Sequence, residues 1–261
     1  MKDKKHQFGY TIVEVMIVLA VSGMMFVIAA NFINGKQAKT SFTQGVNSLA
    51  SQIQDVIDDV VDGKYSDVAL TCNDSSSSVS INPTANPQGK NAPCVFRGKL
   101  MHFYGSPNDR NKYEVIPLVD LRAPPSGTAT DLSRINSHPT LVQKELVPQR
   151  LNVVSGIVTP SAGSDVNAYN IGFIQSSGTR NVSGIGYKSG TQSISLVYVP
   201  VSINMSTTNP AIAGSLNGTV SPARSFVICV SDGSRYAIIS VGGNANGLLT
   251  VSTKMKGESS C

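Results

Sequence analysis

The hydrophobic pattern predicts one long helix at the start of the chain. Residues 10–33 are apolar throughout, with Glu14 as the one strongly ionised side chain among them. As a helix this run is about 36 Å long, which spans a bilayer core with some tilt. Further on, apolar residues recur at spacings of three and four and favour one buried helix face. These residues are Phe42, Val46, Leu49, Ile53, Val56, Ile57 and Val60. Gly63 predicts the end of a helix over residues 10–62.

After residue 63 the pattern changes to short apolar runs separated by turn residues, which favours β-strands. Candidate strands lie at 94–105, 113–121, 151–158, 169–175 and 193–203. Asp232-Gly233 and Asn246-Gly247 separate three alternating runs and predict an antiparallel meander over 225–255. Pro200 indicates an edge or interrupted strand. Segments rich in Ser, Pro and Gly predict loops at 73–93, 122–140 and 204–224. The predicted fold class is α+β, with a long N-terminal helix packed on an antiparallel sheet.

Composition favours an exported domain. The chain is 41% hydrophobic and only 14% charged, below the usual quarter, while Ser, Thr, Asn and Gly are abundant. The net charge is +5, and Lys2, Lys4 and Lys5 supply three of the positive charges. This gives no case for a dedicated nucleic-acid protein, and nucleic acid stays an open but unsupported partner. The nearest basic group is Arg97, Lys99, Arg110 and Lys112, which a solvated strand edge explains equally well.

The position of Glu14 needs an explanation. The three leading lysines place the chain start in the cytoplasm and send the rest outward. A carboxylate deep in a membrane costs about 2.5–3.5 kcal/mol, and the apolar run contains no cation to pair with it. Cleavage after Gly9 would create an α-amino group on Tyr10, one helical turn from Glu14. In an assembly, the glutamate of one subunit can then neutralise the amine of its neighbour.

The segment "KKHQFGYTIVEVMIVLAV" resembles the prepilin signature of type IV pilins and type II secretion pseudopilins. That signature has a short basic leader ending in Gly, then an aromatic residue, Thr, two aliphatic residues, Glu and a long apolar helix. The resemblance implies that prepilin peptidase cuts after Gly9 and that Tyr10 becomes an N-methylated N-terminus. It also implies that Glu14 is the assembly glutamate, with Thr11 beside it. Tyr10 departs from the Phe or Met that is more frequent in this family.

The resemblance implies four segments: a leader at 1–9, a membrane helix at 10–33, an amphipathic helix at 34–62 and a β-rich head outside the cytoplasm at 63–261. The chain would be a membrane-stored filament subunit. Its length of 252 residues after cleavage favours a minor pilin or an H-like pseudopilin. The implied partners are other pilin subunits, prepilin peptidase, a membrane assembly platform, and lipid before assembly.

Four cysteines stand at 72, 94, 229 and 261. An even number in an exported domain predicts two disulfides, and proximity favours Cys72 with Cys94 and Cys229 with Cys261. Two other connectivities remain, as do four separate buried thiols. A bridge that closes the C-terminal region is also similar to the arrangement in type IV pilins.

The sequence contains no pattern typical of an enzyme. His102 falls on a predicted strand, His138 falls in a predicted loop, and His6 belongs to the leader. G-x-S-x-G, H-E-x-x-H and P-loop patterns are absent, as is zinc-ligand spacing. We therefore expect no catalytic residue, no metal and no cofactor. The alternative function is a secreted or signal-anchored extracellular binding domain with a conventional signal at 1–29, in which Glu14 has no role.

Overall fold

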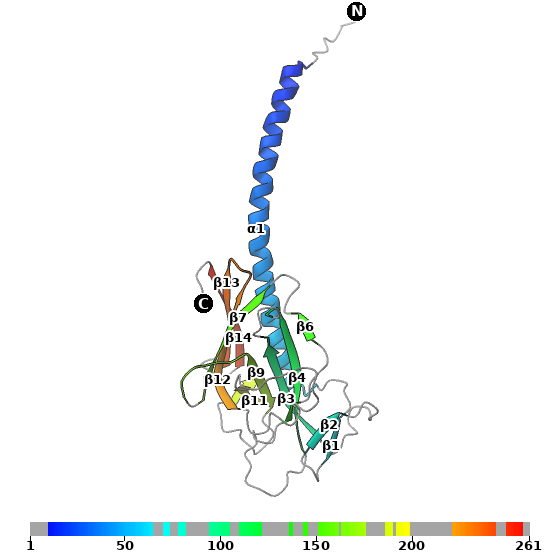
Figure 1. Cartoon of the computed structure of the whole chain (residues 1–261), viewed down its shortest axis with the longest axis vertical. Helices are drawn as coiled ribbons and strands as arrows, with labels where there is room; N and C mark the ends of the chain where they lie inside the picture. The colour runs from blue at the N-terminus through cyan, green and yellow to red at the C-terminus, as the bar shows by residue number, and fades with distance from the viewer. Residues whose placement is uncertain are drawn as a thin grey trace, which may run out of the picture. The chain divides into compact units, whose positions relative to one another are not determined.

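The structure is a computed structural model of the chain (Figure 1). It describes residues 10–64, 70–73, 78–81, 94–104, 110–121, 136–137, 143–145, 151–161, 163–175, 186–189, 192–198, 221–243 and 249–257. The chain divides into two units, residues 1–44 and 45–261, and each is described by itself.

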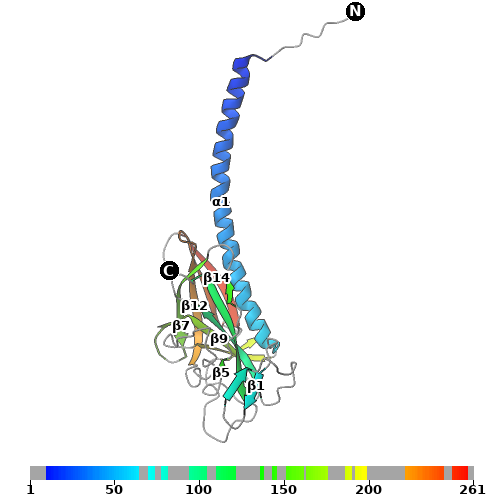
Figure 2. The ribbon, with the colours of Figure 1, turned by 45° about the vertical axis from the view of Figure 1, so that its right-hand side comes forward.

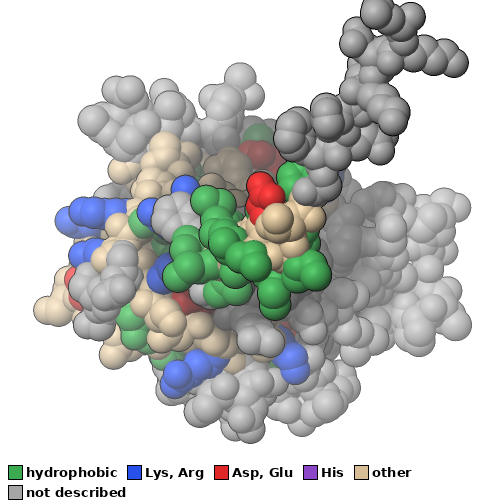
Figure 3. All heavy atoms as spheres, turned by 90° about the horizontal axis from the view of Figure 1, so that it is seen from above, with side chains coloured by type: hydrophobic (Ala, Val, Ile, Leu, Met, Phe, Trp, Pro, Cys, Tyr) green, Lys and Arg blue, Asp and Glu red, His purple; other side chains and the backbone are tan. Residues whose placement is uncertain are grey.

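One unbroken helix, α1 (Ile12–Val61), forms as predicted (Figure 2). It contains no Pro, so nothing in it removes a backbone donor and kinks the helix. Gly63, with a φ of 65°, ends it in a Schellman motif. There the Gly63 N–H donates to Val60 O over 3.2 Å and the Lys64 N–H donates to Asp59 O over 2.8 Å. In its first part the apolar side chains are exposed, and they gather at the end of the helix that faces the viewer in Figure 3.

In the residues that the structure describes, two antiparallel sheets follow the helix. The first pairs β1 (Leu70–Asn73) with β2 (Ser78–Ile81), which lie partly in a segment predicted to be a loop. The second has 12 strands, in the central order β14-β13-β12-β11-β9-β3-β4-β5. The strands on that path, in chain order, are β3 (Cys94–Phe103), β4 (Lys112–Leu121), β5 (Asn136–Ser137), β9 (Asn170–Gln175), β11 (Gln192–Tyr198), β12 (Ser221–Ser231), β13 (Tyr236–Gly243) and β14 (Leu249–Gly257). Off the path lie β6 (Gln143–Glu145), β7 (Asn152–Pro160), β8 (Val166–Asn167) and β10 (Gly186–Ser189).

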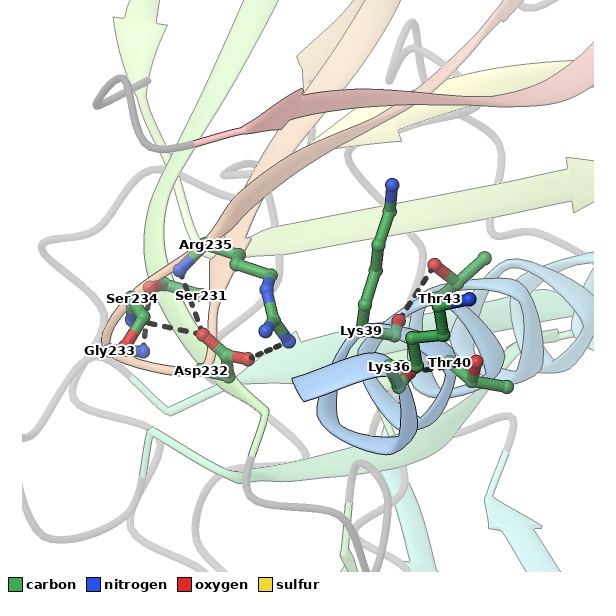
Figure 4. Close-up of polar contacts among 9 residues, drawn as sticks. All are labelled: Lys36, Lys39, Thr40, Thr43, Ser231, Asp232, Gly233, Ser234 and Arg235. Atoms are coloured by element: carbon green, nitrogen blue, oxygen red, sulfur yellow. Dashed lines mark hydrogen bonds and ion pairs between the residues drawn. The ribbon is translucent and has the colours of Figure 1, made fainter. Parts of the chain in front are cut away.

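The predicted C-terminal meander is confirmed as β12-β13-β14. Its first turn is built by Asp232, whose Oδ1 accepts hydrogen bonds from the N–H groups of Ser234 and Arg235 over 2.9 and 2.8 Å (Figure 4). Gly233 takes the left-handed φ of 96° that this turn requires. The second turn, at Asn246-Gly247, and Pro200 lie outside the described residues. The short strand β5 lies within the segment 122–140 that was predicted to be a loop.

The second part of α1 packs on β3, β4 and β9. The six apolar stripe residues from Val46 onward are buried, which confirms their predicted role in the core. Three polar contacts fix the helix on the strands. The Lys99 ammonium lies 2.7 Å from Asp59 Oδ2, the Tyr113 hydroxyl donates to Gln52 Oε1 over 2.9 Å, and Gln175 Nε2 donates to Val61 O over 3.5 Å.

From Lys99 onward, the odd-numbered residues of β3 point toward the helix, because side chains alternate along a strand and Lys99 contacts Asp59. Phe103 therefore lies in the core beneath α1, with its ring centre 6.0 Å from that of Tyr113 and 6.2 Å from that of Phe226. Phe226 belongs to β12, so the three aromatic rings link β3 and β4 to β12 in one core. Gly98 forms a bulge in β3. A Cβ atom there would stand 1.9 Å from Phe173 O on β9, and only glycine allows this approach.

We expect Lys99→Met to lower the free energy of unfolding by about 1–2 kcal/mol, because it removes a charge-assisted hydrogen bond. The side chain of Lys99 is 13% exposed and that of Asp59 is 34% exposed, so solvent screens the pair only in part. Lys64→Met is the matched control. Lys64 is 67% exposed and lies 3.7 Å from the same carboxylate, and its loss should cost less than about 0.5 kcal/mol. Urea unfolding of the full chain in detergent, followed by circular dichroism, measures both. Equal losses would contradict a special role for Lys99.

Candidate assembly site at the helix N-terminus

Thr11 caps the first turn of α1. The Glu14 N–H donates to Thr11 Oγ1 over 3.3 Å and to Thr11 O over 3.1 Å, and the Val15 N–H donates to Thr11 O over 3.2 Å. Threonine is a favoured N-cap residue, because its hydroxyl accepts from an N–H that the helix leaves unpaired. Thr11-x-x-Glu14 also has the spacing of a capping box. This local signal was readable in the sequence, although Thr11 was predicted only as an assembly residue.

The cap places Glu14 in the first helical turn. The backbone dipoles of a helix sum to a partial positive charge at this end, and a carboxylate there is stabilised by about 0.3–1 kcal/mol. Glu14 thus has a favourable environment within its own chain. A carboxylate at the centre of a membrane helix costs about 2.5–3.5 kcal/mol. Glu14 lies only about 6 Å from the start of the apolar run, so it meets part of that cost.

The surface around this turn is exposed and apolar. Tyr10 is 82% exposed and Ile12 81% exposed, and the large apolar side chains up to Ile28 are exposed as well. By length and composition, Ile12–Ala29 is able to cross a membrane, a test that a signal sequence near the N-terminus also passes. Ser22 Oγ donates to Val18 O one turn back, so this hydroxyl is satisfied without water. An apolar surface of this size indicates burial in lipid or against other chains.

Of the residues predicted for processing and assembly, some lie within the described part of the chain and one lies outside it. Gly9 lies outside it, whereas Tyr10 directly precedes the cap and Thr11 and Glu14 share the first turn. The structure therefore brings together three of the four residues predicted for processing and assembly. The role of each stays a prediction.

The cysteine pairs also stay predictions. Cys229 is the one cysteine whose side chain falls in the described part, and it is 3% exposed on β12. In the sheet register Cys229 lies opposite Ile238, which lies opposite Lys254 on β14. Cys261, its predicted partner, lies outside the described residues.

Residues 4–30 match the prokaryotic N-terminal methylation motif. No curated protein and no solved structure matches the chain. The motif covers most of the leader, the residues on both sides of the predicted cut and the apolar part of α1. The chain therefore carries a prepilin signal of the type IV pilin and pseudopilin kind, which supports a pilin-like filament subunit anchored by an apolar N-terminal helix.

In the head, His102 lies in a row of polar side chains across three strands. In the register it stands between Glu114 on β4 and Asn170 on β9. Its Nδ1 contacts Asn170 Oδ1, and its ring lies edge-on to Tyr104 with ring centres 4.8 Å apart. The Tyr104 hydroxyl donates to Glu114 Oε2 over 3.1 Å. The row lies on the face of β3 opposite α1, because His102 alternates with Met101 and Phe103, which point toward the helix.

Burial favours the neutral forms in this row. Burial lowers the pKa of His102 below 6.5, and the hydrogen bond to Asn170 opposes this. Burial raises the pKa of Glu114 above 4.5, and the hydrogen bond from Tyr104 opposes that. In the described part of the chain, no three His, Cys, Asp or Glu side chains are grouped closely enough to hold a metal ion. His138 lies outside that part.

These shifts predict a pH dependence of opposite sign for the two groups. His102 binds a proton less tightly when folded, so its contribution to the free energy of unfolding is lost as pH falls from 6.5 through its lowered pKa. Glu114 contributes stability below pH 4.5 that is lost as pH rises through its raised pKa. We expect His102→Gln to flatten the loss of stability below pH 6.5, by about 1.4 kcal/mol per unit of pKa difference. Glu114→Gln should steepen it.

Urea unfolding of the full chain in detergent between pH 7.5 and pH 4 provides the measurement. The free energy of unfolding should fall less steeply below pH 6.5 in His102→Gln than in the wild type. An equal fall in both would show that the pKa of this imidazole is not lowered in the folded state.

Proposed function

We propose that this chain is a subunit of a type IV pilus-like filament, stored in the cytoplasmic membrane and cleaved after Gly9. One observation carries the proposal. The methylation motif runs directly into a capped helix whose apolar side chains are exposed and whose first turn holds Glu14. This segment is suited to join many copies through their helices. We also propose that the chain is not an enzyme and needs no cofactor, because its sequence contains no pattern typical of catalysis.

Cleavage explains the position of Glu14. A cut after Gly9 leaves the α-amino group of Tyr10 immediately before the cap residue Thr11. The dipole of the helix offsets about 0.3–1 kcal/mol of the cost of placing the carboxylate in the membrane, and part of that cost remains. The N-terminal amine of a neighbouring subunit offsets the remaining cost of the carboxylate when the two helices lie in register. The pairing thus stabilises one axial offset between neighbouring subunits more than other offsets.

The sheet covers one face of the second part of the helix. The sheet buries the apolar stripe from Val46 onward, so those residues are not available to another subunit. Prepilin peptidase and a membrane assembly platform are the partners that this route requires, and lipid surrounds the helix before assembly. We propose a minor pilin or a pseudopilin, based on the length of 252 residues after cleavage. The head would then lie outside the cytoplasm.

The N-terminus of the protein from its native cells tests the processing step. We expect mass spectrometry to find a chain that begins at Tyr10, with or without an added methyl group. A chain that begins near Ala30 would have lost Glu14 and the apolar helix. That result would support instead the secreted binding domain, which the same helix, read as a signal sequence, allows.

Glu14→Ala tests the charge. We expect the variant to insert into the membrane more readily, because the buried carboxylate is gone. Its incorporation into filaments should fall at least about tenfold, which corresponds to a loss of about 1.4 kcal/mol per contact. Immunoblots of sheared filaments and of membranes give the two quantities. Asp62→Asn, an exposed carboxylate change near the other end of α1, should leave both unchanged.

Thr11→Ala separates the charge from the cap. Loss of the N-cap should cost about 1 kcal/mol of helix stability, and Thr11→Ser, which keeps the hydroxyl, should restore it. If Glu14 acts only through the first turn, the Thr11→Ala and Glu14→Ala variants will assemble equally poorly. The proposal requires a clearly larger loss for Glu14→Ala.

A further inference from the structure

Two exposed residues of α1 carry opposite charges on nearly opposite sides of the helix. Lys39 and Asp55 are both exposed, and the side chain of Lys39 extends away from the helix (Figure 4). Sixteen residues separate the two positions, which is about 24 Å along the helix axis and about 160° around it. The ammonium and the carboxylate of one chain therefore cannot reach each other.

Neither charge is used in an ion pair within the part of the chain that the structure describes. Beside Asp55, the cations Lys64 and Lys99 lie 3.7 and 2.7 Å from the Asp59 carboxylate instead. Burial raises the pKa of Tyr113 above 10.0, and the negative charge of Asp55 raises it further. On the surface of one subunit, Lys39 and Asp55 thus face solvent.

The arrangement of the two charges suits contacts between parallel copies of the chain. In a head-to-tail contact, one side of each subunit meets the opposite side of the next, and such contacts generate open helical filaments. Lys39 and Asp55 lie on the two sides that a contact of this kind brings together. Packed helices lie about 8–10 Å apart, and the flexible four-carbon stem of lysine helps its ammonium to span that distance.

We propose that Lys39 of each subunit forms an ion pair with Asp55 of a neighbouring copy. The inference rests on the proposed filament and adds a contact beyond the apolar part of α1. The pair requires an axial offset of about 24 Å between the two copies. Pairing of Glu14 with the amine of Tyr10 requires an offset of four residues, about 6 Å. The two ion pairs therefore join each subunit to different neighbours.

Asp58 provides a matched control for Asp55. It is exposed, lies one turn further along α1, and accepts a hydrogen bond from Gln54 Nε2 over 3.0 Å. Asp58 lies about 100° from Lys39 around the axis, compared with about 160° for Asp55. A neighbour that brings Asp55 to Lys39 therefore directs Asp58 to the side.

Charge reversal in the full chain tests the pair. We expect Lys39→Glu and Asp55→Lys each to lower incorporation into filaments about fivefold, because each change brings like charges together. The double variant with both changes should recover to within about twofold of the wild type. Lys39→Glu combined with Asp58→Lys should not recover. Immunoblots of sheared filaments, normalised to the amount of each variant in membranes, give these ratios.

Cross-linking of wild-type filaments identifies the partner directly. A carbodiimide joins an ammonium to a carboxylate as an amide, with loss of water, when the two groups are in contact. We expect mass spectrometry to find Lys39 linked to Asp55 in filaments, and not in monomers in detergent, where about 24 Å separates the two residues.

The outcomes separate this proposal from the function on which it rests. Filaments without the link, or a double reversal that does not recover, overturn the ion pair alone. A link from Lys39 to Asp58, or to a different pilin, also overturns it. If the wild-type chain is present in membranes but absent from filaments, the proposed function and the ion pair fail together.

Discussion

Continuity of α1 is the constraint on which the other features depend. A helix of 50 residues without Pro satisfies its own backbone hydrogen bonds along its length. It can therefore enter lipid at one end and a protein core at the other without exposing unpaired N–H or C=O groups. Only the side chains then have to differ between the part of the helix suited to lipid and the part packed in the protein core. The first part is apolar on all sides, whereas the part from Val46 onward is apolar on one face only.

The two ends of the helix solve the same problem of unpaired backbone groups with different residues. Thr11 accepts the first N–H groups, and the Schellman motif at Gly63 pairs the last carbonyls. At the first end the cap also places a carboxylate beside the positive pole of the helix. This local gain offsets only part of the cost of moving a carboxylate from water into lipid. The cost that remains for the Glu14 carboxylate is the physical reason to propose a pairing with a second chain. This reasoning does not depend on the structure of the head.

The head contributes through burial. Its sheet covers the apolar stripe of α1, and Lys99, Tyr113 and Gln175 bond polar groups of the same helix segment. On the opposite face of β3, His102, Glu114 and Tyr104 form a polar row in which burial favours neutral side chains. The two faces of β3 therefore make different contacts. One face packs on the helix, and the other carries side-chain hydrogen bonds between neighbouring strands.

The sequence by itself determined the features that depend on neighbouring residues. Period 3.6 predicted α1, Gly63 predicted its end, Asp232-Gly233 predicted the first turn of the meander, and the prepilin pattern around Gly9 and Glu14 predicted the signal that the motif match supports. Thr11 as a cap was equally local and was missed. Tertiary structure alone decided that β3 lies beside β9, that β12 pairs with both β7 and β13, and that His102 meets Glu114 and Asn170. Such pairings join residues far apart in the chain. They are selected by the total apolar surface that the assembled sheet and helix can bury, which no short stretch of sequence contains.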